Sequence, residues 1–306
     1  MEKLVRKDSH GNSIHLYVYK PKTTAKAVVQ IIHGAAEHFA RYGLFAEFLT
    51  QNGYAVVGCD ILGHGLSTDT YDYVHFGDRD GDKIAFESLL LTKDYIVKTF
   101  PKAHVYLLGH SMGSFLSPLL VRTVPDFYKK VVFSGATIAS GFMINVGIVL
   151  ARLIRIFKGP KHVSPLLQTM LIDSSHTRMR KDKLISGINE EWLTKDKTIQ
   201  DYYHNSQMCG QPFTVSANLA LLTWLKDANS HKNLLKLPKG LPILFISGMC
   251  DPLSNYGAGI RATHAFLQKS GFTDVSMILY ESDRHEVLNE TDREKVYQDV
   301  LNFFEK

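Results

Sequence analysis

The segment at residues 105–114 constrains the fold most, because it joins an apolar run to the pattern G-x-S-x-G at residues 109–113. An apolar strand that leads into this pattern predicts a tight turn between a buried strand and a helix, with the serine at its tip. Side chains at positions 109 and 113 would collide with the neighbouring strand and helix, so Gly109 and Gly113 make the turn possible. The pattern nominates Ser111 as a nucleophile, although an ordinary strand, turn and helix can carry the same letters.

The rest of the chain alternates between strand-like runs and helical stretches such as residues 84–99. The strand-like runs cover residues 13–19, 27–32, 54–60, 104–108, 130–133, 242–247 and 275–280. Such alternation predicts an α/β fold with a mostly parallel central sheet that helices flank on both faces. In a sheet of this kind we expect the functional site at the carboxyl ends of the strands.

The alternation stops after Ser134 and resumes near residue 240, and the intervening sequence predicts helices and loops. We therefore expect three segments. Residues 1–134 form the first part of the core, residues 135–239 form a helical cap or lid inserted after the nucleophile half, and residues 240–306 complete the core. At 306 residues, with 45% hydrophobic and 21% charged residues, the chain can bury a large core and has an ordinary globular composition.

A serine hydroxyl is a poor nucleophile at neutral pH, so it needs a histidine to take its proton and an acid to orient that histidine. Asp251 and His285 each follow a strand-like run, as the acid and the base should. Asp283 is the rival acid, but Asp251 is favoured because the orienting carboxylate usually comes from a separate loop. His110 adjoins the serine and is expected to pack under the turn. The order serine, aspartate, histidine is that of the α/β-hydrolase fold.

The negative charge of a tetrahedral intermediate needs backbone N–H donors. The amides of Met112, directly after the serine, and Ala35, in the loop after residues 27–32, are the expected donors. The same loop holds His33, Glu37 and His38, but this spacing differs from the H-E-x-x-H pattern of a zinc helix. The sequence therefore predicts neither a metal nor a cofactor.

These ordered motifs resemble those of the monoacylglycerol lipase and lysophospholipase-like serine hydrolases, in particular their bacterial members. The motifs are residues 33–38 with 41–42, residues 60–67, the serine turn, Asp251 and residues 284–286. The resemblance implies hydrolysis of carboxylic esters of lipid-like substrates through an acyl-enzyme. It carries the roles of nucleophile, acid, base and two amide donors onto Ser111, Asp251, His285, Ala35 and Met112.

The sequence departs from this family pattern at three places, because Ala36, Ser114 and Ser282 stand where glycine is common. These departures affect loop detail and the width of the acyl pocket, but they remove no reacting group. Two other functions stay open: an esterase or peptidase of the same fold that acts on small polar esters or amides, and a non-catalytic binding protein. The complete set of reacting groups argues against the second.

Within the expected cap, residues 142–157 form an apolar run with Arg152, Arg155 and Lys158 at near-helical spacing. The run is too short and too charged to span a membrane. Its apolar side could roof the acyl pocket or touch lipid, or it could be buried against the core. We favour the first interpretation, because a lipase-like site needs an apolar entrance.

The first ten residues lack the apolar region of a signal peptide, and three cysteines fit reduced thiols better than a disulfide framework. The expected compartment is the cytoplasm. The net charge of +5 is mild and shows no nucleic-acid footprint. Basic residues near the cap helix favour transient contact with an anionic membrane surface. The expected partner is a small lipid-like ester, and the sequence leaves the oligomeric state open.

Overall fold

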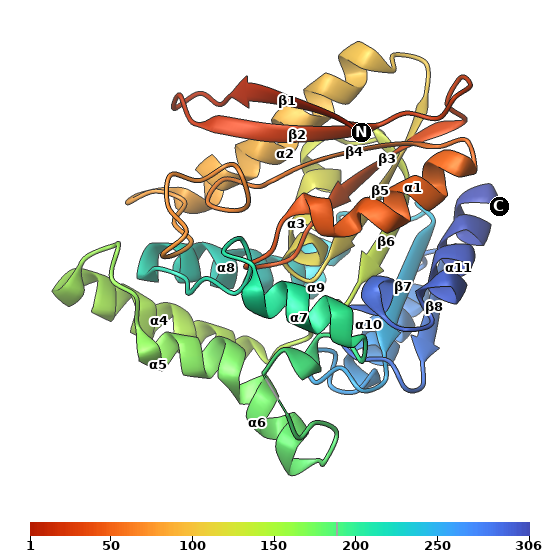
Figure 1. The fold of residues 1–306 in the computed structure, drawn as a ribbon. Helices are drawn as coiled ribbons and strands as arrows, with labels where there is room; N and C mark the ends of the chain where they lie inside the picture. The colour runs from red at the N-terminus through yellow and green to blue at the C-terminus, as the bar shows by residue number, and fades with distance from the viewer. Residues whose placement is uncertain (188) are drawn as a thin grey trace.

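The computed structural model describes residues 1–187 and 189–306, which contain one eight-stranded sheet with the strand order β1-β2-β4-β3-β5-β6-β7-β8 (Figure 1). Strands β3 to β8 pair in parallel, and β1 and β2 add an antiparallel edge. The strands are β1 (Glu2–Lys7), β2 (Ser13–Tyr19), β3 (Ala27–Ile32), β4 (Ala55–Cys59), β5 (His104–His110), β6 (Tyr128–Ser134), β7 (Ile243–Gly248) and β8 (Val275–Tyr280). The predicted mostly parallel sheet is therefore confirmed.

Helices cover both faces of this sheet (Figure 1). The α-helices are α1 (Gly43–Gln51), α2 (Gly81–Thr99), α3 (Met112–Thr123), α4 (Gly141–Lys158), α5 (Pro165–Gln168), α6 (Ser174–Lys181), α7 (Lys197–Asn205), α8 (Val215–Ala228), α9 (His231–Leu234), α10 (Ala258–Lys269) and α11 (Arg293–Glu305). Short 3₁₀ turns are η1 (Phe39–Tyr42), η3 (Asn189–Trp192) and η4 (Val287–Asn289), and η2 (Thr169–Asp173) is a π turn. Helices α1 and α11 share one apolar cluster, whereas α2, α3, α8 and α10 share another.

The central strands are buried on both faces, which explains why they read as continuous apolar runs. All residues of β3, β4 and β7 are buried. Their side chains alternate between the two clusters: Val28 and Ile32 join the α2–α3 side, whereas Val29 and Ile31 join the α1–α11 side. The sheet therefore fixes the register of the loops at its carboxyl edge, because a shift by one residue would exchange the two faces.

Strand β1 was not predicted from the sequence, and its pattern explains why. Five of its six residues are exposed, including Lys3 and Arg6, so it carries no alternating apolar signal. It lies at the edge of the sheet and pairs with β2 alone. Charged residues on an exposed edge strand also discourage pairing with another chain.

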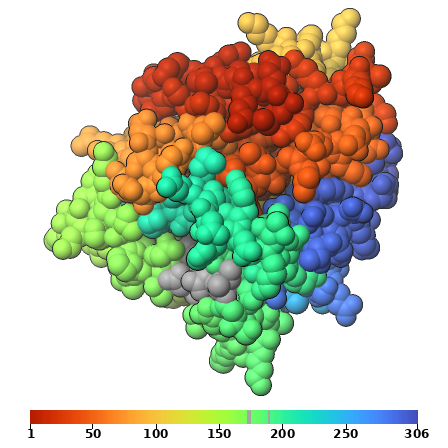
Figure 2. All heavy atoms as spheres, in the orientation of Figure 1, coloured from red at the N-terminus to blue at the C-terminus, as the bar shows by residue number. Residues whose placement is uncertain are grey.

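Helices α4 to α9 lie between β6 and β7, where the sequence alternation stops. In Figure 1, α4, α5 and α6 project away from the sheet, and the space-filling view shows this green segment beside the red and orange N-terminal part (Figure 2). Nine of the fourteen residues of helix α8 are buried, and the helix packs against α2, α3 and α4. The helical insertion therefore contributes to the main core through α8.

Helix α4 begins and ends within one residue of the predicted run. The favoured interpretation was that its apolar side roofs the acyl pocket or touches lipid, and the first of these two roles is wrong. Its stripe of Ile144, Gly147, Ile148 and Ala151 is buried, and the helix packs on α8. Within the described residues, no residue of α4 lines the cavity beside Ser111. The helix therefore does not roof that cavity. Its other apolar face is exposed to solvent.

Candidate active site

Ser111 lies in a strained turn at the carboxyl end of β5, directly before α3. Its backbone has φ 50° and ψ −113°, a conformation that residues other than glycine rarely adopt. A Cβ atom on Gly109 would lie 2.3 Å from the carbonyl oxygen of Gly113, and one on Gly113 would lie 2.2 Å from that of Ile32. The predicted steric role of both glycines is confirmed, since any side chain there would collide with backbone.

His285 and Asp251 meet beneath the carboxyl edge of the sheet. The Nδ1 atom of His285 lies 2.9 Å from Oδ2 of Asp251, and both side chains are almost fully buried. Burial lowers the pKa of the His285 imidazole, but the charge of Asp251 and its hydrogen bond outweigh burial and raise the pKa above its ordinary value. The arrangement therefore favours a histidine that can hold a proton for part of a reaction.

The rival acid Asp283 has a different partner. Its Oδ1 atom accepts a hydrogen bond from Lys195 Nζ at 2.8 Å, whereas Asp251 makes the contact with the imidazole. His110, the other histidine beside Ser111, is buried under the turn, and its Nδ1 lies 3.1 Å from Ser134 Oγ. Burial first, and then the charge of His285, lower the pKa of His110 to about 4, so this ring is neutral near pH 7.

Ser111, His285, Ala35 and Met112 all line one cavity of about 250 Å³. Met112 is the first residue of α3, where a backbone N–H has no partner within the helix. The lining of the cavity includes the apolar residues Phe115, Leu171, Phe213, Leu221, Leu222, Leu225 and Leu253. It also includes polar residues, among them Gln168, Ser175, His176, Glu190, Tyr203 and Gln211. The cavity therefore offers contacts to both apolar and polar groups of a bound molecule.

The loop after β3, residues 33–38 and hereafter the β3 loop, is held by buried carboxylates. Glu37 Oε1 accepts from the backbone N–H of Gly34 at 2.6 Å. Asp60 accepts from the N–H of Phe39 at 2.9 Å, which fixes the end of the loop. Ala36 has φ 51°, so alanine adopts the left-handed conformation at the position where the family often has glycine. The loop conformation is thus maintained although the glycine is absent.

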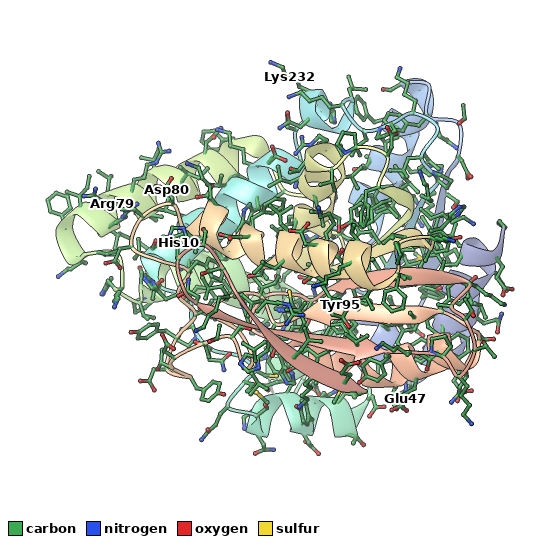
Figure 3. All side chains as sticks on the ribbon, turned by 90° about the horizontal axis from the view of Figure 1, so that it is seen from above. His10, Glu47, Arg79, Asp80, Tyr95 and Lys232 are labelled. Carbon is green, nitrogen blue, oxygen red and sulfur yellow. The ribbon has the colours of Figure 1, made fainter. Side chains whose placement is uncertain are left out.

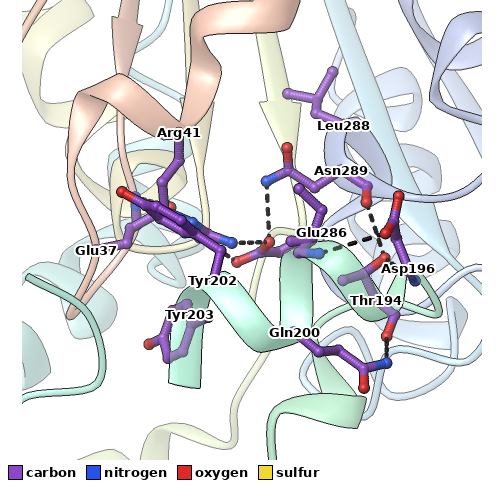
Figure 4. A network of polar contacts seen from close by, with 12 residues as sticks. Glu37, Arg41, Thr194, Asp196, Gln200, Tyr202, Tyr203, Glu286, Leu288 and Asn289 are labelled. Atoms are coloured by element: carbon purple, nitrogen blue, oxygen red, sulfur yellow. Dashed lines mark hydrogen bonds and ion pairs between the residues drawn. The ribbon is translucent and has the colours of Figure 1, made fainter. Parts of the chain in front are cut away.

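A buried ion-pair network joins the β3 loop to the loop after β8, residues 281–290 and hereafter the β8 loop (Figure 4). Arg41 donates to Glu37 Oε2 at 2.5 Å and makes two hydrogen bonds of 2.6 Å to the carboxylate of Glu286. All three side chains are at least 96% buried. The guanidinium also lies 4.9 Å from the ring of Tyr203 on α7. The network connects the residues beside Ala35 and His285 to the helical insertion.

The residues that raised the question of a metal are engaged in other contacts. His33 Nε2 accepts from the N–H of Ile61 at 2.9 Å, and its Nδ1 lies 2.7 Å from the carbonyl oxygen of Gly34. His38 Nε2 lies 3.0 Å from the hydroxyl of Tyr202. Within residues 1–187 and 189–306, no group of three or more His, Cys, Asp or Glu side chains is arranged to hold a metal ion.

Sequence analysis missed several residues of the site. Trp192 stacks on the ring of His285 with centroids 4.7 Å apart, and Lys195 pairs with Asp283. Both lie in the insertion, where no motif marks them. The Glu37–Arg41 pair has the i, i+4 spacing of an ion pair, but spacing does not reveal that Glu286 completes it from 245 residues away.

Comparisons with known proteins place the chain in a family of hydrolases. The sequence profile of the hydrolase family described as serine aminopeptidase, S33, matches residues 23–292. The chain is 25% identical over 284 residues to the monoglyceride lipase of Mus musculus, and the matched region covers 91% of this chain and 81% of that protein. It is 30% identical over 306 residues to the monoacylglycerol lipase of Mycolicibacterium smegmatis, which covers 94% of this chain and 90% of that protein.

A solved structure shows the same fold. The thermostable carboxyl esterase from Bacillus coagulans, in complex with glycerol, superposes with a TM-score of 0.89 at 21% identity, over 99% of this chain and 97% of that chain. At this identity the likeness establishes the fold alone. Together, the sequence and structure comparisons confirm the fold and the family resemblance that the motifs predict.

Proposed function

The chain belongs to the serine aminopeptidase S33 family of hydrolases, and within this family we propose that it cleaves carboxylic esters of lipid-like substrates, monoacylglycerols or lysophospholipids, through an acyl-enzyme. One observation carries the proposal: His285, hydrogen-bonded to Asp251 at 2.9 Å, lines the same cavity as Ser111. Serine hydrolysis requires this convergence of nucleophile, base and acid. Relatives named monoglyceride lipase and monoacylglycerol lipase support the lipid ester as substrate.

In the proposed mechanism, Ser111 Oγ attacks the ester carbonyl carbon while Nε2 of His285 takes the hydroxyl proton. Asp251 stabilises the resulting imidazolium, and the raised pKa of His285 supports this role. The backbone amides of Ala35 and Met112 bind the oxyanion. The imidazolium then gives its proton to the leaving alcohol, and water repeats the sequence on the acyl-serine. Each step uses groups that line or adjoin the cavity.

In the proposed orientation the acyl chain contacts the apolar lining residues Leu221, Leu222 and Leu225 of α8. The alcohol contacts polar lining residues such as Glu190 and Gln211. Residues 135–239 act as a cap in this proposal, because they supply more than half of the residues that line the cavity. The proposed mechanism uses no metal or cofactor.

Contact with an anionic membrane surface is part of the proposal, and the outer face of α4 supports it. Seven exposed apolar residues lie along this helix: Phe142, Met143, Val146, Val149, Leu153, Ile156 and Phe157. The exposed basic residues Arg152 and Lys158 lie among them and suit anionic lipid headgroups. None of the described helices has both the length and the apolar character that a membrane crossing requires. We propose that the contact is peripheral and transient and that the protein works in the cytoplasm.

The end of α4 has a fixed neighbour on the protein. The loop before α2, which carries Arg79 and Asp80, lies beside α4 in the view from above (Figure 3). Arg155 donates to the carbonyl oxygen of Asp78 in that loop. This contact ties the carboxyl-terminal half of α4 to the core, so the exposed face keeps its orientation.

A substrate panel on the wild type and Ser111→Ala tests the proposed function. The panel contains monoacylglycerols of graded chain length, lysophospholipids, short p-nitrophenyl esters and amino-acid amides. We expect turnover of a monoacylglycerol or lysophospholipid to fall about a millionfold in the variant. The control is Ser117→Ala on the same helix, whose Oγ donates to the carbonyl oxygen of Gly113. Equal activity of wild type and Ser111→Ala contradicts the mechanism, and cleavage confined to small esters or amides contradicts the lipid substrate.

A further inference from the structure

The insertion contacts the β8 loop at Leu184, whose carbonyl oxygen accepts from Arg284, and along residues 191–195, hereafter the Trp192 stretch. The N–H of His285 donates to the carbonyl oxygen of Trp192 at 3.4 Å, and the N–H of Glu286 donates to that of Leu193 at 2.7 Å. Thr194 Oγ1 donates to the carbonyl oxygen of Asn289 at 2.9 Å. Two of these bonds join backbone to backbone, and the third joins a side chain to the backbone. They fix the position of the Trp192 backbone relative to that of His285.

The Trp192 side chain uses this placement to cover the imidazole of His285. The two rings are nearly parallel, with an angle of 22° and centroids 4.7 Å apart. On another side of the imidazole lies His110, with its centroid at 4.9 Å and an angle of 51°. Asp251 holds Nδ1, so the ring is restrained by neighbours from three different elements. Nε2, across the ring from Cγ, is the nitrogen that takes the proton of Ser111 in the proposed mechanism.

We propose that Trp192 is a positioning residue for His285: its indole face holds the imidazole against rotation and stabilises the imidazolium that forms during acyl transfer. The inference rests on the proposed function, because it assigns to Trp192 an effect on the base of that reaction. It also gives the insertion a second task besides lining the cavity. Neither of these tasks requires Trp192 to touch the substrate.

The physical basis is the negative face of the indole ring, which attracts a cation that lies over it. Such an interaction is weak at an exposed site and stronger where water is excluded. His285 is 2% exposed, so the imidazolium formed there has little water to stabilise it. Trp192 is only partly buried, and the centroids of its ring and the His176 ring lie 5.6 Å apart. Both the indole and the imidazole of His285 line the cavity, so the indole is part of the wall beside the base.

Several other groups also set the charge of His285, and the test must hold them constant. They are Asp251 from the loop after β7, Glu286 from the β8 loop, Glu37 from the β3 loop and His110 from β5. Arg41 pairs with both glutamates, and His176 lies beside Trp192, so these two charged or titratable groups must stay constant as well. Replacement of Trp192 by a residue that still excludes water leaves these groups in place. Phenylalanine and leucine form a suitable pair, because both are apolar but only phenylalanine has an aromatic face.

The experiment compares Trp192→Phe and Trp192→Leu with the wild type on p-nitrophenyl butyrate, a soluble ester, between pH 5 and pH 9. Without the aromatic face the imidazolium is less stable, so the pKa of His285 falls. We expect the acid limb of kcat/KM in the leucine variant to move to lower pH by about half a unit to one unit. Its maximal kcat should fall about three- to tenfold, with little change in KM. In the phenylalanine variant, the midpoint of the acid limb and the maximal kcat should stay close to those of the wild type.

A spectroscopic measurement supports the kinetic one and needs no turnover. Trp192 and Trp224 are the two tryptophans of the chain, so the emission of Trp192 is the difference between wild type and Trp192→Phe. A protonated imidazole quenches an indole that it touches. We expect this emission to titrate with the same midpoint as the acid limb, and the midpoint to fall in Asp251→Asn. In His176→Gln the midpoint should stay, since His285 is the ring that titrates.

The outcomes separate this inference from the proposed function. If Ser111→Ala retains esterase activity, the proposed function fails, whatever Trp192 does. If the activity depends on Ser111 but the acid limbs of wild type, Trp192→Phe and Trp192→Leu coincide, Trp192 only fills space and the inference is overturned. A shift to higher pH in the leucine variant, or loss of the fluorescence titration in His176→Gln, overturns it as well. Thermal melting of the leucine variant shows whether that variant folds. If the leucine variant is unfolded, the phenylalanine variant and the fluorescence titration test the inference in its place.

Discussion

Helix α4 belongs to the helical insertion and the β8 loop contacts that insertion, but different forces hold the two segments in place. Buried polar contacts hold the β8 loop: Glu286 binds Arg41 through two hydrogen bonds, and Asp283 binds Lys195. Helix α4 packs on α8 through an apolar stripe that includes Ile144. Polar contacts are directional and fix distances, whereas apolar packing tolerates a change of side chain. The comparison therefore separates the part of the molecule that sets reacting geometry from the part whose outer surface can vary.

The largest effect is expected from Arg41→Met, which removes the cation between two buried carboxylates. Glu37 and Glu286 would then be buried without their partner, and such a loss costs about 3–5 kcal/mol of the free energy of unfolding. Urea denaturation measures this loss. The matched control is Arg152→Met on the exposed side of α4, which should change stability by less than about 0.5 kcal/mol. Similar losses in the two variants would contradict the comparison.

Acid should weaken the same network. Burial raises the pKa of Glu37, but the charge of Arg41 and neighbouring groups outweigh it and lower the pKa from 4.5 to about 2. A carboxyl whose pKa is depressed by folding stabilises the fold above its unfolded pKa, and this contribution is lost as pH falls from about 4.5 toward 2. At pH 7 Glu37→Gln should be less stable than the wild type by a few kcal/mol, and this difference should shrink across that window.

Urea denaturation at several pH values checks the prediction for Glu37. The exposed residue Glu2 supplies a control, because Glu2→Gln removes one carboxyl that is half exposed on the edge strand. The stability of Glu2→Gln should follow that of the wild type at each pH. If the curves of Glu37→Gln and wild type run parallel from pH 7 to pH 2, Glu37 does not stabilise the fold by its charge.

A smaller effect is expected from Lys195→Met, because Lys195 is partly exposed. Its removal leaves buried Asp283 without a partner, since Oδ2 of Asp283 already has none among the described residues. The expected cost is about 1–3 kcal/mol at pH 8. Burial already raises the pKa of Asp283 to about 6, and loss of Lys195 should raise it further. A raised pKa favours the protonated form in the folded state, so the deficit should shrink as pH falls toward 5.

The double variant Lys195→Met with Asp283→Asn sharpens this test. An amide at position 283 needs no cation, so the second substitution should recover much of the stability that the first one loses at pH 8. The asparagine variant should also lose the dependence on pH. If the two losses simply add, the Lys195–Asp283 contact does not hold the β8 loop.

The sequence was sufficient to predict strands β2 to β8 and which residues follow them. Strand β8 begins and ends at the predicted residues, because a buried parallel strand needs an apolar run and that run is visible. The turn at Ser111 was visible for a related reason, since only glycine fits at positions 109 and 113. Local steric demands of this kind leave a local record in the sequence.

The contacts that join distant segments left no such record. Arg41 finds Glu286 and Trp192 finds His285 only because the sheet brings the loops together. Strand β1 was missed because an exposed edge strand needs no apolar side chains. Helix α4 was placed correctly from its apolar run, but the run does not tell which side faces α8. A helix with apolar residues on two faces gives the same composition whether it roofs a cavity or meets solvent.

The buried and the exposed face of α4 allow the most direct comparison of a constrained and an unconstrained surface, because both belong to one helix. Ile156 and Phe157 are 75% and 80% exposed, so replacing both by serine should change the free energy of unfolding by less than about 0.5 kcal/mol. Ile148→Ser, on the buried stripe of the same helix, should cost about 2–4 kcal/mol.

Activity should show the opposite order. If the outer face touches lipid, the Ile156 and Phe157 double variant should keep its rate on p-nitrophenyl butyrate but lose about tenfold in binding to anionic vesicles, because each side chain contributes apolar area. Vesicle sedimentation measures the binding, and monoacylglycerol dispersed in the same vesicles measures the rate. A double variant that binds and hydrolyses vesicles like the wild type would show that the exposed face has no lipid contact. In that case the exposed apolar residues of α4 would have no function of their own. The two regions would then differ only in how strongly the structure restricts their side chains.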